Sequence, residues 1–143
     1  MFEDDNKILL KDNNCHIICV EPTLWCVERL IPFLNKNFDK QSIEVLSTGI
    51  DKVNGSANFN VTSVHILNCL EASEDTLTNY DVDSIKVKIP VLSLDTILDT
   101  IDSEVDFCKC DIEGAELEAF LFSKNIRKVK NLAFTSTPKV LYS

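Results

Sequence analysis

The feature that most constrains the fold is one segment in which an apolar run ends in two acids and passes directly into a helical pattern. Residues 105–111 read V-D-F-C-K-C-D, and Glu113 and Gly114 follow before a stretch with helical spacing. We expect a buried strand over 105–111 and a helix from about Gly114. In an open α/β sheet, ligands bind just beyond the carboxyl ends of the strands. The segment therefore predicts a ligand site that includes Asp111 and Glu113.

Strand and helix patterns alternate in the first third of the chain. Residues 16–20 and 43–46 are short apolar runs typical of buried parallel strands. Between them, residues 24–37 carry a helical stripe with Thr23 as the expected N-cap. Pro32 lies inside that stripe and should kink the helix or end it early.

The remaining two thirds continue this alternation. The expected elements are a turn at Asn54-Gly55, a strand over 59–70, a loop over 71–83, a half-exposed strand over 85–90, a helix capped by Ser93 and a strand over 131–135. In the helix after Gly114 we expect Leu117, Phe120 and Leu121 to face inward. Alternating strands and helices predict βαβ units and a mostly parallel α/β sheet in one domain over residues 1–143.

The charge balance excludes several classes of partner. Lys and Arg number 14 and Asp and Glu 23, which gives a net charge of −9. This argues against nucleic-acid phosphates or an anionic membrane as the main partner. The apolar run at 17–20 is too short to span a bilayer, and the acidic first residues do not resemble a secretory signal. We expect a cytoplasmic protein with no nucleic-acid or membrane partner.

The cysteines do not have the spacing of a metal site. Cys15, Cys19 and Cys26 are separated by three and six residues, and Cys108 and Cys110 by one. Paired zinc ligands usually have two residues between them. We expect no metal, and we interpret the cysteines as reduced packing residues.

Glu21, at the end of the first expected strand, is a candidate ligand for ribose hydroxyls, although a loop carboxylate without a ligand has the same sequence signature. Asp111 and Glu113 could bind a metal, hold a cofactor's ammonium group or act as general base. Alternatively, Glu113 caps the following helix. Lys109 interrupts the strand and could snorkel, pair with a carboxylate or point into the site. The only glycines are Gly49, Gly55 and Gly114, so no glycine-rich phosphate loop is present.

Several of these segments, taken in order, resemble the FkbM-type methyltransferases, which use S-adenosylmethionine. The resemblance is carried by I-I-C-V-E-P at 17–22, G-S-A-N-F at 55–59, V-L-S-L-D-T-I-L at 91–98 and F-C-K-C-D-I-E-G-A-E at 107–116. The pairing of the Ser-Leu-Asp helix start with the K-x-D-x-E-G-A-E run about a dozen residues later is the most specific of these signals. The resemblance covers roughly residues 15–123.

The resemblance implies a class I methyltransferase fold, Rossmann-like, that transfers a methyl group from S-adenosylmethionine to a hydroxyl of a small molecule or sugar. It implies that Glu21 holds the cofactor ribose and that the Gly49-Ile50-Asp51 loop lies near the adenine. It places Asp111 and Glu113 at the methionine end and the substrate pocket, with Asp111 as the candidate base and a second cofactor contact.

The chain also departs from the family pattern. Members begin with a strand and a glycine-rich loop before the Glu-Pro strand, and here that segment would have to precede residue 1. The C-terminal antiparallel strands also have no counterpart. An incomplete sheet exposes unpaired edges, which favours self-association. A non-catalytic, truncated binding or interaction module is therefore the alternative function, and a metal-dependent hydrolase using Asp111 and Glu113 is a third.

Overall fold

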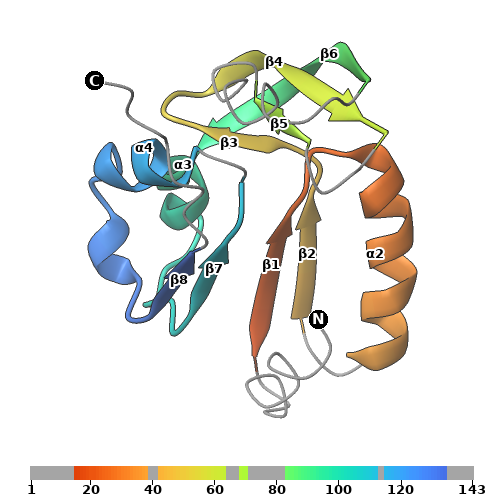
Figure 1. Cartoon of the computed structure of the whole chain (residues 1–143). Helices are drawn as coiled ribbons and strands as arrows, with labels where there is room; N and C mark the ends of the chain where they lie inside the picture. The colour runs from red at the N-terminus through yellow and green to blue at the C-terminus, as the bar shows by residue number, and fades with distance from the viewer. Residues whose placement is uncertain (1–14, 39–41, 64–67, 71–82, 113–114, 135–143) are drawn as a thin grey trace. The chain divides into compact units, whose positions relative to one another are not determined.

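The computed structural model describes residues 15–38, 42–63, 68–70, 83–112 and 115–134 (Figure 1). The chain divides into two compact units, residues 1–48 and residues 49–143, which are described separately. In the described part of the chain, no helix is both long and apolar enough to cross a bilayer.

The first unit is a single βαβ motif. Strand β1 (His16–Val20) pairs in parallel with β2 (Ser42–Leu46), and α2 (Leu24–Asn37) connects them. Thr23 is the N-cap, and the helix buries Val27 and Leu34. Pro32 lies inside α2 but does not end it early, since the helix continues to Asn37. A proline removes only one intrahelical donor, and the flanking turns keep their hydrogen bonds.

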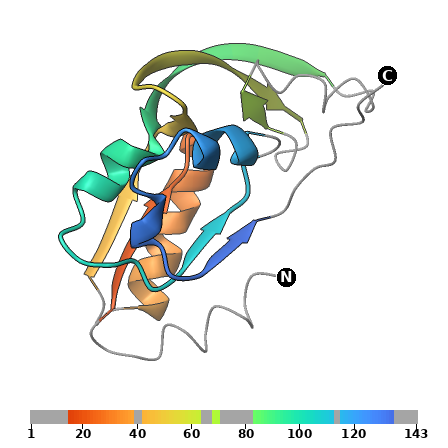
Figure 2. The same ribbon diagram turned by 90° about the vertical axis from the view of Figure 1, so that its left-hand side faces the viewer.

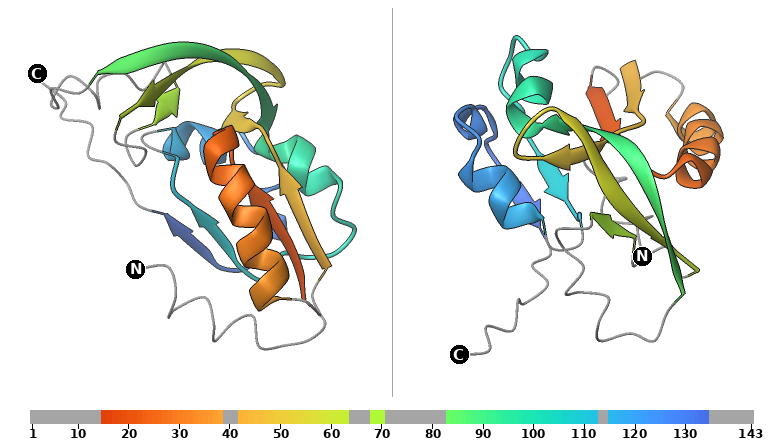
Figure 3. Two further views of the ribbon diagram at one scale, coloured as in Figure 1. Left: turned by 90° about the vertical axis from the view of Figure 1, so that its right-hand side faces the viewer. Right: turned by 90° about the horizontal axis from the view of Figure 1, so that it is seen from above.

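The second unit contains a four-stranded sheet in the order β3-β6-β4-β5. Its strands are β3 (Gly49–Asp51), β4 (Gly55–Thr62), β5 (Cys69–Leu70) and β6 (Ser84–Ser93). Only β3 and β6 are parallel, while β4 runs antiparallel to both β6 and β5. The expectation of a mostly parallel sheet is not confirmed for this sheet, which is mixed. Figure 3 shows the two long strands β4 and β6 lying side by side and curving along their length.

In β4 and β6, successive side chains lie on opposite faces of the sheet. Phe59, Leu70, Ile89 and Val91 are buried together on one face. The predicted strand over 59–70 is wrong as one element, because Phe59 pairs with Leu70 in antiparallel register and the chain must reverse between them. The expected loop at 71–83 lies, except for residue 83, outside the described residues.

A third, two-stranded sheet pairs β7 (Cys108–Cys110) in parallel with β8 (Leu132–Phe134) (Figure 2). The strand predicted over 105–111 is thus shorter than expected, and Val105 forms a separate bridge to Val129. Around these strands lie α3 (Leu94–Asp99), α4 (Glu116–Leu121) and a 3-10 helix, η3 (Ile126–Lys128).

The predicted inward face of α4 is wrong for two of its three residues. Leu117 and Leu121 are 64% and 72% exposed, whereas Glu116 and Ala119 are buried. Phe120 is half-buried and its ring lies 5.7 Å from that of Phe134. The buried stripe is therefore rotated by about one residue from the apolar stripe of the sequence, which brings a carboxylate inward.

Candidate functional site

Glu21 lies at the carboxyl end of β1 and its carboxylate is held locally. Its backbone N–H donates to the Leu46 carbonyl at 3.0 Å, and its Oε1 accepts from the Thr23 N–H at 2.7 Å. The side chain is half-buried at the start of α2. Because a carboxylate offers about four lone-pair sites, this one contact leaves capacity for ligand hydroxyls.

Gly49 has a packing role in β3. The segment Gly49-Ile50-Asp51 is a strand and not the loop that we expected from the family resemblance. A Cβ at Gly49 would lie 2.9 Å from Ile89 Cδ1 and 3.2 Å from Val91 Cγ1, so glycine allows β3 to lie close to β6. Asp51 ends the strand, and its Oδ1 accepts from the Lys52 N–H at 2.7 Å.

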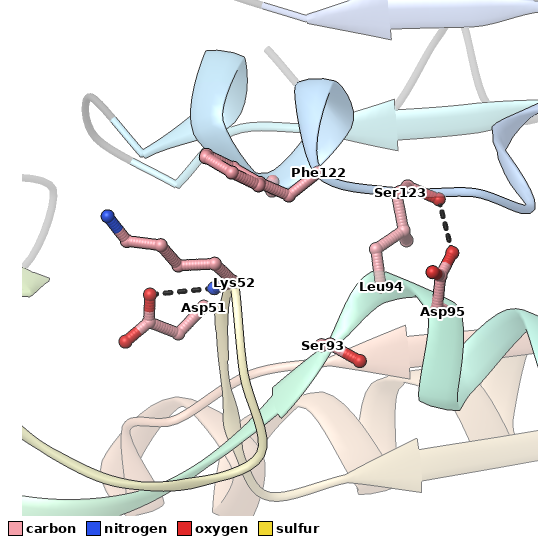
Figure 4. Close-up of a pocket in the computed structure, with 8 residues that line it drawn as sticks. Asp51, Lys52, Ser93, Leu94, Asp95, Phe122 and Ser123 are labelled. Atoms are coloured by element: carbon pink, nitrogen blue, oxygen red, sulfur yellow. Dashed lines mark hydrogen bonds between the residues drawn. The ribbon is translucent and has the colours of Figure 1, made fainter.

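A small pocket lies beyond the parallel pair β3 and β6 (Figure 4). Its lining residues are Asp51, Lys52, Ser93, Leu94, Asp95, Ala119, Phe122 and Ser123. The Lys52 Nζ contacts Glu118 Oε2 at 3.0 Å and lies 5.6 Å from the centre of the Phe122 ring. The pocket volume is about 40 Å³, far below the roughly 300–1,000 Å³ of typical ligand sites. It can hold a few waters but not a nucleoside cofactor.

Asp95 connects α3 to the segment that follows α4. Its Oδ1 accepts from Ser123 Oγ at 2.6 Å and from the Asn125 N–H at 3.0 Å, and its Oδ2 accepts from the Lys124 N–H at 3.0 Å. These hydrogen bonds, first that of Ser123, hold the pKa of Asp95 below its ordinary value. The predicted cap is confirmed, since Ser93 Oγ accepts from the Thr96 N–H. Sequence reasoning missed this use of Asp95, because its partners lie far along the chain.

Asp111 is the first residue after β7, and Glu116 is the first residue of α4. Asp111 directly follows the strand and is exposed, while Glu113 lies outside the described residues. Lys109 is exposed, so β7 is not a fully buried strand and the lysine does not lie in its core. Glu116 is only 3% exposed, and its Oε1 accepts from the Ile112 N–H at 2.8 Å. Sequence reasoning missed Glu116, although it closes the K-x-D-x-E-G-A-E run.

The comparison with protein families finds one match. The family described as "Methyltransferase FkbM domain" matches residues 4–137. The chain belongs to the FkbM methyltransferase family. No curated protein and no solved structure matches it.

The FkbM domain has a second buried group at the same strand end, the Cys110 thiol. Burial, and then the nearby Cys108, Glu116 and Asp111, raise the pKa of Cys110 to about 12. A thiol with so high a pKa is protonated at neutral pH, so it is a packing group and not a nucleophile.

The predicted site residues of the FkbM domain thus have different surroundings. Glu21 belongs to the first unit, whereas Asp51 and Asp111 belong to the second, in which Asp51 lines the small pocket. Among the residues described, no group of three or more His, Cys, Asp or Glu side chains is arranged to hold a metal ion.

Proposed function

We propose that this FkbM domain transfers a methyl group from S-adenosylmethionine to a hydroxyl oxygen of a small molecule or sugar. The observation that carries the proposal is the family match over residues 4–137. Carboxylates at the ends of the parallel strands β1 and β7 support it, since such positions face ligands in open α/β sheets. Three parallel pairs, β1-β2, β3-β6 and β7-β8, support a Rossmann-like class I arrangement as the finer description of the fold.

Two of the carboxylates in the described residues could bind groups that S-adenosylmethionine carries. Glu21 can accept from two ribose hydroxyls, and the exposed carboxylate of Asp111 can hold an ammonium group. In this proposal Asp51 contributes near the adenine, while Gly49 and Ile50 act through the position of β3. Gly49 fits this indirect role, because its lack of a side chain serves packing against Ile89.

The reaction then needs a positioned acceptor and a base. When bound, the cofactor would supply an electrophilic sulfonium methyl group and, once the methyl–sulfur bond breaks, would leave as S-adenosylhomocysteine. Asp111, with Glu113 as the second candidate, would take the proton from the acceptor hydroxyl as its oxygen gains the methyl group. An exposed carboxylate at the end of a strand can take up this proton and release it to water.

The alternative function is that of a non-catalytic binding or interaction module, which has the FkbM domain but does not bind the cofactor. One observation favours it: the chain contains only three glycines, and Gly49 is used for packing, so none of the described residues forms a glycine-rich cradle for a cofactor.

Isothermal titration of the 143-residue chain with S-adenosylhomocysteine separates the two functions. Micromolar binding supports the methyltransferase, and no binding up to millimolar concentration supports the module. Glu21→Gln should then weaken binding at least about tenfold, because an amide has fewer acceptor sites than a carboxylate. Glu28→Gln, on the exposed surface of α2, is the matched control and should bind like the wild type.

The partners and location form part of the same proposal. The acceptor is a small molecule or glycan, and neither nucleic acid nor a membrane is a partner. The five cysteines whose side chains are described are free, which supports a reducing compartment such as the cytoplasm. In addition, β8 pairs only with β7 among the described strands, and its open edge is our candidate surface for self-association.

A further inference from the structure

The carboxylate of Glu116 is the most enclosed charged group described in the second unit. It belongs to the first residue of α4, and Oε1 accepts the Ile112 N–H at 2.8 Å. An enclosed carboxylate is unfavourable unless hydrogen bonds satisfy it, and a bond from a backbone amide to a charged acceptor is among the stronger kinds. The side chain thus links the first residue of α4 to the backbone shortly after β7.

This bridge fixes the backbone on the far side of Asp111. On its near side, Cys108 N–H donates to the Asn131 carbonyl at 2.9 Å, and Cys110 pairs with Phe134 in the β7-β8 ladder. Asp111 therefore lies between the last paired residue of β7 and the hydrogen-bonded amide of Ile112. Its side chain is exposed while its backbone is held on both sides.

The Cys110 thiol is a buried neighbour of this bridge at the last residue of β7. Burial, and then the charges of Cys108, Glu116 and Asp111, raise its pKa.

We propose that Glu116 is a positioning residue, whose enclosed carboxylate holds the Asp111-Ile112 backbone so that Asp111 keeps its place in the methyl-transfer site. The role rests on the proposed function, since Asp111 acts in the site only if the domain binds S-adenosylmethionine. In this role Glu116 acts through the backbone of Asp111 and Ile112 and is not a catalytic residue. Rigid support of this kind matters because a displacement of about 1 Å can cost about 100-fold in rate.

Two variants separate the reach of the side chain from its charge. Glu116→Gln keeps the length and an acceptor oxygen but loses the charge. Glu116→Asp keeps the charge but is one methylene too short to reach the Ile112 amide. If position matters, Glu116→Gln should bind S-adenosylhomocysteine within about threefold of the wild type, whereas Glu116→Asp should bind about tenfold more weakly or worse. Equal losses in both variants, or none in Glu116→Asp, would overturn the proposal.

Amide hydrogen exchange at Ile112, measured by NMR on the labelled full chain, provides a readout without ligand. The amide should be protected in the wild type and in Glu116→Gln, and should exchange rapidly in Glu116→Asp. Rapid exchange in the wild type refutes the bridge even if Glu116→Asp does not fold. If the wild type protects Ile112 but does not bind S-adenosylhomocysteine, the proposed function fails and Glu116 is left with a purely structural role.

Discussion

At the scale of single residues, Asp95 accepts three hydrogen bonds from a segment nearly thirty residues further along the chain. Its three acceptor contacts hold Ser123, Lys124 and Asn125 against the start of α3. The connection after α4 thus depends on one ionised group.

We expect Asp95→Asn to lower the urea midpoint at about pH 7, because the amide has fewer acceptor sites and no charge. The pKa of Asp95 is lowered in the folded state, so its contribution is complete above the unfolded value of about 3.9 and is lost as pH falls through the folded value. The difference between the variant and the wild type should therefore shrink at about pH 3. Asp102→Asn, at an exposed position, is the control and should show no such difference. A gap independent of pH would contradict the role of ionised Asp95.

Gly49 allows a second prediction at this scale. Gly49→Ala should destabilise the fold by about 1 kcal/mol, because the new Cβ would lie too close to Ile89 Cδ1. In an Ile89→Val background that Cδ1 atom is absent, so Gly49→Ala should cost measurably less. Urea unfolding of the two single variants and the double variant gives the coupling. Additive effects of the two substitutions would show that the contact with Ile89 Cδ1 does not cause the destabilisation by Gly49→Ala.

At the scale of elements, the buried face of α4 is rotated by about one residue from the face that the sequence predicts. Leu121→Ser should change the free energy of unfolding by no more than about 0.5 kcal/mol, because Leu121 is 72% exposed. Ala119→Leu, on the same helix, should cost about 1–3 kcal/mol, because Ala119 is 4% exposed and the pocket beside it, about 40 Å³, is too small for the added carbons of leucine. Thermal melts of the two variants test the orientation. A larger loss in Leu121→Ser would show that Leu117 and Leu121 face inward after all.

The sequence allowed the prediction of elements whose determinants are local. The apolar runs of β1 and β2, and the cap at Ser93, were recognised because neighbouring residues decide them. The orientation of α4 was missed because the stripe of apolar residues gives no sign that the carboxylate of Glu116 is buried and accepts from the Ile112 N–H. The contacts of Asp95 were missed because they join residues nearly thirty positions apart.

The pairing of strands was also outside the reach of local patterns. A strand pattern identifies a pleated segment but not its neighbour, so the antiparallel pairs of β4 could not be distinguished from parallel ones. For the proposed site, Glu21 and Asp111 stay predictions from the ends of two strands, whereas the contact of Glu116 with the Ile112 N–H is visible only in the structure.

At the scale of the whole molecule, the exposed strand β8 decides the association that we expect. Leu132, Ala133 and Phe134 are all exposed. Sedimentation velocity should show a species heavier than the monomer as concentration rises. Ala133→Lys should keep the chain monomeric, because lysine on an edge strand opposes pairing. Ser103→Lys adds the same charge at an exposed bend and should associate like the wild type. A wild type that is monomeric at every concentration would remove this proposal.

The long pairing of β4 with β6 affects how fast the chain folds. Residues as distant in sequence as Gly55 and Val91 meet in that ladder, and β6 must also accept β3. The entropy of closing so long a loop is lost before the apolar face gains contacts, so such sheets form slowly. Refolding followed by stopped-flow fluorescence should therefore take milliseconds to seconds, the range of sheets dominated by non-local pairs. During that interval the apolar side chains of the β4-β6 face are open to other chains, and low protein concentration should improve the yield.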